Sequence, residues 1–142
     1  MIAYGDTDWM GAEREEPVRR LAEAINRRDA EAAVAVCHPE VEFLSVLAVS
    51  GRAFFGHDGM REYFEDISSA WEEWRVEVHD LATAPDGRVA ILMTMHMRGK
   101  GSGAPLSQRT GHVWTLKDGK LLRNQPFRDP DDALREVGRS PA

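Results

Sequence analysis

Residues 74–128 decide the fold and read WRVEVHDLATAPDGRVAILMTMHMRGKGSGAPLSQRTGHVWTLKDGKLLRNQPFR. Apolar and β-branched side chains recur here with a period of two, and short turns rich in Gly, Asp and Pro interrupt them. We expect four strands, at Trp74–Ala84, Arg88–Arg98, Leu106–Leu116 and Lys120–Arg128. Because the turns Pro85-Asp86-Gly87 and Lys117-Asp118-Gly119 are short, strands that follow one another must run antiparallel.

The residues before this meander predict three helices and a strand pair. Glu13–Arg28 has an apolar face and Pro17 in its first turn. A short second helix follows, with Asp29 as its N-cap and His38-Pro39 as its stop. The third helix is expected from His57 to about Trp71, with Asp58 as its cap.

A strand pair separates the second helix from the third, and a short helix closes the chain. The first strand is expected at Glu40–Val49, where the period changes to two, and Ser50-Gly51-Arg52 turns into a short return segment. Asp129-Pro130 ends the last strand and begins a small helix, Asp131–Val137.

This order of elements predicts one α+β domain. The domain covers residues 13–138, after a loosely ordered leader at 1–12 and before a tail at 139–142. A long antiparallel or mixed sheet that follows three helices must curve around them to bury its inner face. We therefore expect a cone-like sheet with an internal pocket at its wide end.

Composition excludes several classes of function. The net charge is -6 and basic residues are scattered among acidic ones, so the chain lacks the basic stripe of a nucleic-acid-binding protein. Cys37 is the only cysteine, so no internal disulfide or cysteine cluster can form, and we expect it to be an inert buried thiol. No stretch is long and apolar enough to span a membrane, and a cytoplasmic location is expected.

Several short segments resemble the SnoaL-like branch of the nuclear-transport-factor-two-like superfamily. They are VRRL at 18–21, NRRD at 26–29, HPEVEF at 38–43, GHDGMREYF at 56–64 and HVWTLKDGK at 112–120. The resemblance runs from about Glu15 to Val137 and implies a ketosteroid-isomerase-like fold. It does not choose a function, because the superfamily holds isomerases, polyketide cyclases, an epoxide hydrolase, dehydratases and transport factors.

The resemblance to ketosteroid isomerase does not extend to its chemistry. That enzyme uses a carboxylate base, a tyrosine and a neutral carboxylic acid. The corresponding positions hold Ser45, Leu21 and a residue at or beside His112. Isomerisation by that mechanism is therefore not expected.

The resemblance to the cyclases is partial. It implies a histidine on the penultimate strand, which His112 matches, and an aspartate on the last strand, where no carboxylate occurs before Asp129. An acid–Arg–acid set like that of the epoxide hydrolase cannot be placed on one strand face. No metal or other cofactor is implied, because the five histidines lie on different elements without ligand spacing.

His112 is the predicted polar centre of the pocket and the candidate catalytic residue. An imidazole there is either an acid or base or merely a hydrogen-bonding group. The other predicted pocket residues are Leu21, Ser45, Tyr63, Trp71, Met93, Met95, Thr110, Trp114, Asn124 and Arg128. Asn124 and Arg128 reach the pocket only if strand 120–128 turns their side chains inward. A methionine stripe such as Met93 and Met95 is more often part of the core or of a subunit interface.

Two functional hypotheses remain. In the first, the protein binds a mostly apolar small molecule and is an isomerase, cyclase or hydratase/dehydratase that works through His112. In the second, it is a non-catalytic ligand-binding or dimerising accessory domain. A homodimer through a partly apolar outer sheet face is expected, with His96 and Arg98 as contacts.

Overall fold

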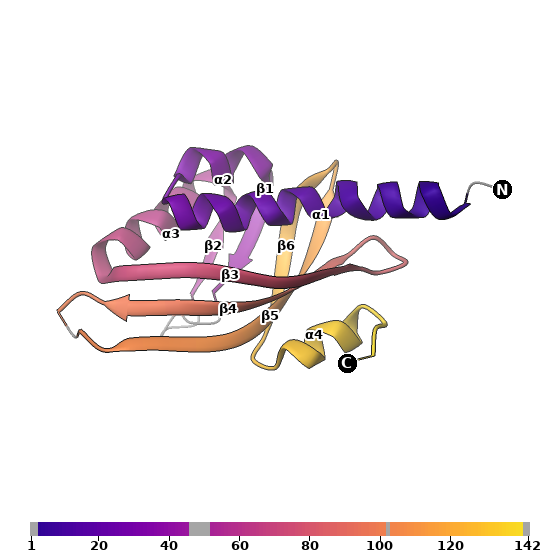
Figure 1. Ribbon diagram of the computed structural model, residues 1–142. Coiled ribbons are helices and arrows are strands. Elements are labelled where there is room, and N and C mark those ends of the chain that lie inside the picture. Colours follow the sequence, from indigo (N-terminus) through magenta and orange to yellow (C-terminus); the bar gives the residue numbers. More distant parts are fainter. Residues whose placement is uncertain (1–2, 46–51, 102, 141–142) are drawn as a thin grey trace.

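A computed structural model describes residues 3–45, 52–101 and 103–140, with side chains from Gly11 onward. Over these residues the chain forms four helices and a six-stranded, mixed, curved sheet that does not close (Figure 1). The elements are α1 (Ala3–Arg27), α2 (Ala30–Val36), β1 (Cys37–Leu44), β2 (Ala53–Phe55), α3 (Gly56–Ala70), β3 (Trp71–Thr83), β4 (Val89–Gly99), β5 (Pro105–Lys117), β6 (Lys120–Phe127) and α4 (Pro130–Glu136). The predicted α+β class is confirmed.

The sheet has the strand order β2-β1-β6-β5-β4-β3. The predicted antiparallel meander, β3 to β6, is confirmed, and β1 joins it by a parallel pairing with β6. Pairing of β3 with β4 extends from Trp71↔Gly99 to Thr83↔Val89, with register shifts near both Glu73 and Asp80. Such irregularities bend and twist a strand, which favours the curvature of this sheet.

Helices α1, α2 and α3 lie on one side of the sheet, and α4 lies on the other (Figure 1). The buried side chains between the first three helices and the sheet form the inner cluster, which includes Leu21, Ile25, Phe43, Tyr63, Trp74, Ile91, Met93, Met95, Met97 and Trp114. The buried side chains between α4 and the other face of the sheet form the outer cluster, which is Ala82, Ala84, Ala90, Leu92, Val113, Ala133 and Val137. Consecutive strand residues alternate between the two clusters, as Ile91 and Leu92 do.

Small residues in the outer cluster let α4 approach the sheet closely. A Cβ atom added to Gly111 of β5 would lie 2.8 Å from the Cβ of Ala133 and 3.2 Å from the Cα of Pro130. Those separations are shorter than van der Waals contact, so β5 needs glycine at this position.

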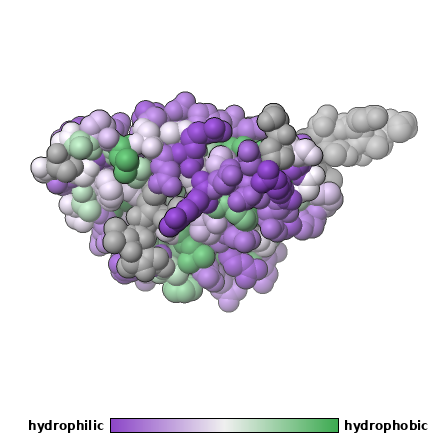
Figure 2. Space-filling view, turned by 90° about the horizontal axis from the view of Figure 1, so that it is seen from below, coloured by the Kyte–Doolittle hydropathy of each residue, from purple (hydrophilic) through white to green (hydrophobic). Residues whose placement is uncertain are grey.

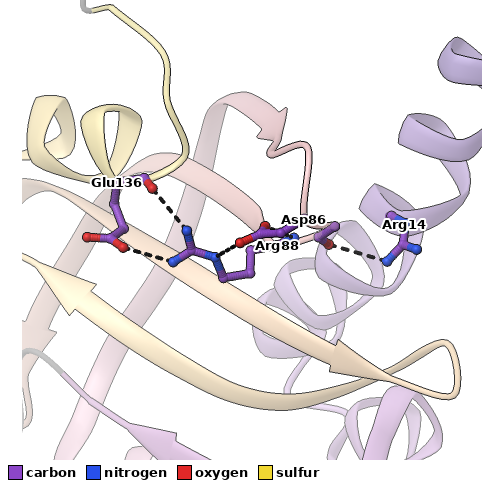
Figure 3. A network of polar contacts seen from close by, with 5 residues as sticks. Arg14, Asp86, Arg88 and Glu136 are labelled. Carbon is purple, nitrogen blue, oxygen red and sulfur yellow. Dashed lines mark hydrogen bonds and ion pairs between the residues drawn. The ribbon is translucent and has the colours of Figure 1, made fainter.

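Arginine side chains fasten the β3–β4 turn to two helices (Figure 3). Arg88 donates from Nε to Asp86 at 2.8 Å and from Nη1 to Glu136 of α4 at 2.8 Å. Arg14 of α1 donates to the carbonyl of Gly87 at 3.4 Å. The turn therefore holds the C-terminal helix in place by polar contacts at the rim of the outer cluster.

The side chain of Asn26 in α1 binds the backbone of the edge strand β3. The amide of Asn26 accepts from the N–H of Val76 at 2.7 Å and donates to the carbonyl of Val76 at 2.9 Å. One side-chain amide thus satisfies both backbone groups of an edge residue, which would otherwise be open to pairing with another strand.

The part of the outer face that α4 leaves uncovered is polar, whereas the sequence predicts a partly apolar face. His96 contacts Glu77 at 2.7 Å and Ser107 at 2.8 Å, and Arg98 contacts Glu72 at 2.8 Å. The apolar part of this face is the outer cluster, which α4 covers. His96 and Arg98 do lie on the outer face, opposite the methionines of β4.

The N-termini of α2 and α3 can be compared with the N-caps that the sequence predicts. Asp29 caps α2 as predicted, accepting from the N–H of Ala32 at 3.1 Å. The predicted Asp58 cap is wrong: α3 begins at Gly56 after Phe55, and Asp58 lies in the first turn, where it pairs with Arg61 at 2.8 Å. There the carboxylate faces the positive end of the helix.

Two other boundaries differ from the prediction. α1 begins at Ala3 instead of Glu13, so Pro17 lies inside the helix, and the loosely ordered leader at 1–12 stays a prediction. His38-Pro39 belongs to β1, at an irregular stretch of its pairing with β6 where the missing N–H of proline is tolerated. The predicted strand end at Val49 and the turn at Ser50-Gly51 lie outside the described residues.

Candidate functional site

A cavity lies between α1 and the concave face of the sheet and has a volume of about 50 Å³. Its wall is built from one stripe of α1, from Tyr63 of α3 and from inner-face residues of the sheet. The residues are Val18, Leu21, Ala22, Ile25, Phe43, Ser45, Tyr63, Trp74, Val76, Ile91, Met93, Met95, Thr110, His112 and Trp114. The α1 residues are spaced at i, i+3, i+4 and i+7, so they share one helix face.

Most of the predicted pocket residues are brought together on this wall. Those that line it are Leu21, Ser45, Tyr63, Met93, Met95, Thr110, His112 and Trp114. Trp71 instead packs on Trp74, with ring centroids 5.0 Å apart, and Arg128 is exposed beyond the end of β6. Asn124 lies on the inner face opposite Trp114 but behind His112, so it touches the site without lining it.

His112 is the polar centre of an otherwise apolar wall. The residue is 5% exposed, and its ring lies nearly parallel to that of Phe43, with centroids 6.5 Å apart. Nδ1 lies 2.8 Å from Nδ2 of Asn124, whereas Nε2 has no hydrogen-bond partner among the described residues. Burial lowers the pKa of His112 to about 4, so the ring is neutral at physiological pH.

Asn124 is held on its other side by the backbone of β1. Its Oδ1 accepts from the N–H of Leu44 at 2.7 Å, and its Nδ2 donates to the carbonyl of Leu44 at 2.8 Å. The residue is only 2% exposed, and these bonds extend the pairing of β1 with β6 where the backbone ladder is irregular. A buried amide with three bonds has its orientation well defined.

The other polar groups on the wall are bonded to the protein. The indole N–H of Trp74 donates to the hydroxyl of Tyr63 at 3.0 Å, and burial raises the pKa of Tyr63. The hydroxyl of Thr110 donates to the carbonyl of Phe127 at 2.6 Å. Nε2 of His112, the hydroxyl of half-buried Ser45 and the hydroxyl proton of Tyr63 are the polar groups of the wall that can meet a ligand.

No charged side chain occurs among the described residues that line the cavity. Nor do the described ranges contain a cluster of three or more His, Cys, Asp or Glu residues that could hold a metal ion. Cys37 lies away from the cavity, and burial raises the pKa of its thiol to about 12, so the sulfur is protonated. This wall can bind an uncharged molecule and offer it a hydrogen bond from His112.

The sequence pattern alone missed part of the wall. Val18, Ala22 and Ile25 are visible in the sequence as the apolar stripe of the first helix, but nothing in that stripe separates a cavity wall from a filled core. Phe43, Val76 and Ile91 likewise read as ordinary inward strand residues. The curvature of the sheet, which sequence periodicity does not report, leaves the space between these two sets.

Among the helices of the described residues, none is both long and apolar enough to cross a membrane. Comparison with known proteins finds that the family model of the SnoaL-like domain matches residues 18–124. No curated protein matches the chain.

Solved structures similar to this chain share its fold at low sequence identity. A nuclear-transport-factor-two-like protein of unknown function from Burkholderia pseudomallei is 21% identical, with a TM-score of 0.72 over 88% of this chain and 97% of the other. A protein of ketosteroid-isomerase-like fold from Catenulispora acidiphila, in complex with trimethylamine, is 15% identical, with a TM-score of 0.72 over 87% and 93%. TerC, co-crystallised with polyporic acid, is 22% identical, with a TM-score of 0.72 over 88% and 97%.

Proposed function

Because the chain belongs to the SnoaL-like domain family, we propose that it binds a small, uncharged and mostly apolar molecule in the cavity beneath α1. The observation that carries this proposal is the composition of the wall. Apolar side chains surround the space, and one buried imidazole, whose Nε2 has no hydrogen-bond partner in the part of the chain that the structure describes, lies on its surface. Ligand sites have this design, because apolar surface supplies affinity and a few polar groups set orientation.

The volume of the cavity limits the size of the molecule. About 50 Å³ holds roughly three to five water molecules at about 10–15 Å³ each, so a larger ligand requires wall side chains to move. Met93 and Met95 are suited to such movement because the unbranched thioether chain adopts many shapes. Two of the similar structures hold a small molecule, trimethylamine or polyporic acid, which supports the same use of this fold.

We favour ligand binding over catalysis. Isomerisation, cyclisation or dehydration needs a group that removes a proton and one that supplies a proton. The ionisable side chains on the described wall are His112 and Tyr63, and burial keeps both uncharged. Neither has a carboxylate partner, so the wall lacks a pair of groups with opposite tasks.

The experiment fills the cavity without changing its chemistry. Ala22→Val adds two methyl groups to the α1 side of the wall, and Ala35→Val makes the same change on an exposed face of α2. Cyclopentanone serves as the probe, and its binding is followed by chemical-shift changes of amides and methyl groups. We expect Ala22→Val to weaken binding about tenfold or more because the space is occupied, and Ala35→Val to leave it unchanged.

The proposal is wrong if cyclopentanone shifts resonances away from the cavity, or if both valine variants bind it as the unchanged protein does. The proposal is also contradicted if cyclopentanone, acetophenone and phenol all leave the resonances of the unchanged protein where they were.

Homodimerisation through the uncovered outer face of β3, β4 and β5 is a further part of the proposal. That face carries His96, Glu77 and Arg98, which are already paired within one chain. Leu106, which is 57% exposed, pairs with Met97 and so belongs to the inner-facing set of β5. Seen from below, the surface of the molecule is mostly hydrophilic, with only scattered hydrophobic residues (Figure 2). A dimer here would therefore be a polar one, and light scattering that gives the mass of a single chain would exclude it.

The cytoplasmic location stays a prediction.

A further inference from the structure

Asn124 has only one orientation compatible with its neighbours. Its oxygen accepts from the N–H of Leu44 at 2.7 Å, and its nitrogen donates to the carbonyl of Leu44 at 2.8 Å. Turning the amide by 180° would set an NH₂ group against an N–H and an oxygen against an oxygen. Both bonds would be lost inside the protein, where unpaired polar groups are costly. The backbone of β1 thus determines which atom of Asn124 faces His112.

The atom that faces His112 is a donor. Nδ2 of Asn124 lies 2.8 Å from Nδ1 of His112, and its second N–H is available for that contact. Nδ1 must therefore accept, and a proton on Nδ1 would oppose the amide hydrogen. In a neutral imidazole the single proton then resides on Nε2, an assignment made from the hydrogen-bond network. The chain of contacts runs from Leu44 through Asn124 to the nitrogen that faces the cavity.

We infer that Asn124 is a positioning residue that holds His112 as a hydrogen-bond donor, so that the cavity selects ligands that present an acceptor, such as the carbonyl oxygen of a ketone, aldehyde, quinone or ester. The selectivity rests on the proposed function, whereas the tautomer does not. Because Nε2 already carries its proton, His112 does not remove a proton from a ligand. It can polarise a carbonyl group instead.

His112 is the only imidazole among the described residues of the wall, and the other polar side chains there are the hydroxyls of Ser45, Tyr63 and Thr110. Thr110 donates its hydroxyl proton to Phe127, and Tyr63 accepts from Trp74. No charged group of α1, α3 or the sheet lines the cavity in the part of the chain that the structure describes. The tautomer of His112 is therefore set by Asn124 and not by a nearby charge.

The first test reads the tautomer without any ligand. Long-range ¹H–¹⁵N spectra of protein labelled in its histidines distinguish a protonated ring nitrogen from an unprotonated one. We expect His112 to show a protonated Nε2 and an unprotonated Nδ1 at pH 7. The opposite pattern, or two protonated nitrogens, would overturn the inference.

Two aspartate variants separate positioning from mere stability. Asn124→Asp places a carboxylate, which only accepts, beside Nδ1, so the proton is expected to move to Nδ1. Asn26→Asp is the matched control, because Asn26 makes the same paired contact with the backbone of Val76 without touching His112. The tautomer of His112 is expected to be unchanged in that variant. If Asn124→Asp fails to fold, the spectrum of the unchanged protein still decides the assignment.

The second test measures selectivity with two probes of equal shape. Cyclopentanone presents a carbonyl oxygen, and methylenecyclopentane replaces it with a CH₂ group. The ratio of their dissociation constants should shift against the ketone by about tenfold in Asn124→Asp and remain unchanged in Asn26→Asp. An unchanged ratio in Asn124→Asp would refute the selectivity. If the predicted tautomer is observed but neither probe binds, the proposed function fails and the positioning role stands.

Discussion

The two faces of the sheet pack against helices in different ways. On the outer face, Gly111, Ala90 and Ala133 bring α4 so close that one added carbon on Gly111 would collide with the helix. On the inner face, Trp74, Met93, Met95 and other large side chains meet α1 across a concave surface and leave a cavity. Small residues permit close contact without a void, whereas large side chains on a curved sheet do not fill all the space between them. The larger side chains of the inner face thus surround the apolar cavity that contains His112.

Two methionines of β4 test this difference most strongly. Met95 lines the cavity, and Met97 is buried on the same face without lining it. Met97→Ala is expected to lower the free energy of unfolding by about 3 kcal/mol, and Met95→Ala by about 2 kcal/mol because it lies beside existing space. Denaturant unfolding measures both values.

The same pair also tests the use of the cavity. Met95→Ala should let the protein bind acetophenone more tightly because it enlarges the cavity, whereas Met97→Ala should not. Equal gains in both variants would mean that the probe binds elsewhere.

The close contact on the outer face predicts a smaller effect. Gly111→Ala should cost about 2 kcal/mol, because Ala133 and the backbone of Pro130 must shift to admit one methyl group. Ala133→Gly removes the closest atom, so the double variant should recover part of the loss beyond the sum of the single changes. Strict additivity would show that the two residues are not in tight contact.

The inner face also carries a buried ionisable group, which the outer cluster lacks among the described residues. Burial lowers the pKa of His112 from 6.5 to about 4, so the unfolded chain binds a proton between those values and the folded chain does not. The contribution of the uncharged His112 ring to the free energy of unfolding is therefore fully present above pH 6.5. It is lost as the pH falls towards 4, by at most about 1.4 kcal/mol for each pH unit. Unfolding measured from pH 7 to 4 should show a shallower decline in His112→Gln, and an identical decline would contradict the burial of the ring.

The smallest effect is expected at the rim of the outer cluster. Arg88→Ala removes the contacts with Asp86 and Glu136 (Figure 3) but leaves the packing of α4 intact. These contacts are largely open to solvent, so the melting temperature should fall by only about 1–3 °C. Hydrogen exchange should accelerate in α4 and not in α1, and faster exchange on both sides would argue against the local role of this network.

The fold follows closely from sequence patterns because its strands are long and its turns are distinctive. Period-two alternation and the DG turns at 86–87 and 118–119 correctly predict the meander. The Asp58 cap was wrong because an aspartate in the first turn of a helix has the same local signature as one at the cap. The added length of α1 was missed because Pro17 reads as a helix start, although a helix that is already formed can contain it.

The site follows from sequence only in part. Alternation predicts that Thr110, His112 and Trp114 share one strand face, and in the structure all three line the cavity. The contact between Asn124 and His112 depends on the register between β5 and β6, which shifts near Leu116, and on the parallel pairing of β1. Neither property is written in the local sequence. Asn124 therefore read as a residue that either lines the pocket or faces out, and its place behind the histidine was not foreseen.

The central claim is that the imidazole of His112 is buried on the wall of the cavity and not exposed to water. Its most direct test is the titration of the His112 ring by NMR, from pH 8 down to the lowest pH at which the protein stays folded. The account predicts a ring that stays neutral through pH 6 and 5, with a midpoint near 4. A midpoint near 6.5, as in a solvated histidine, would contradict it.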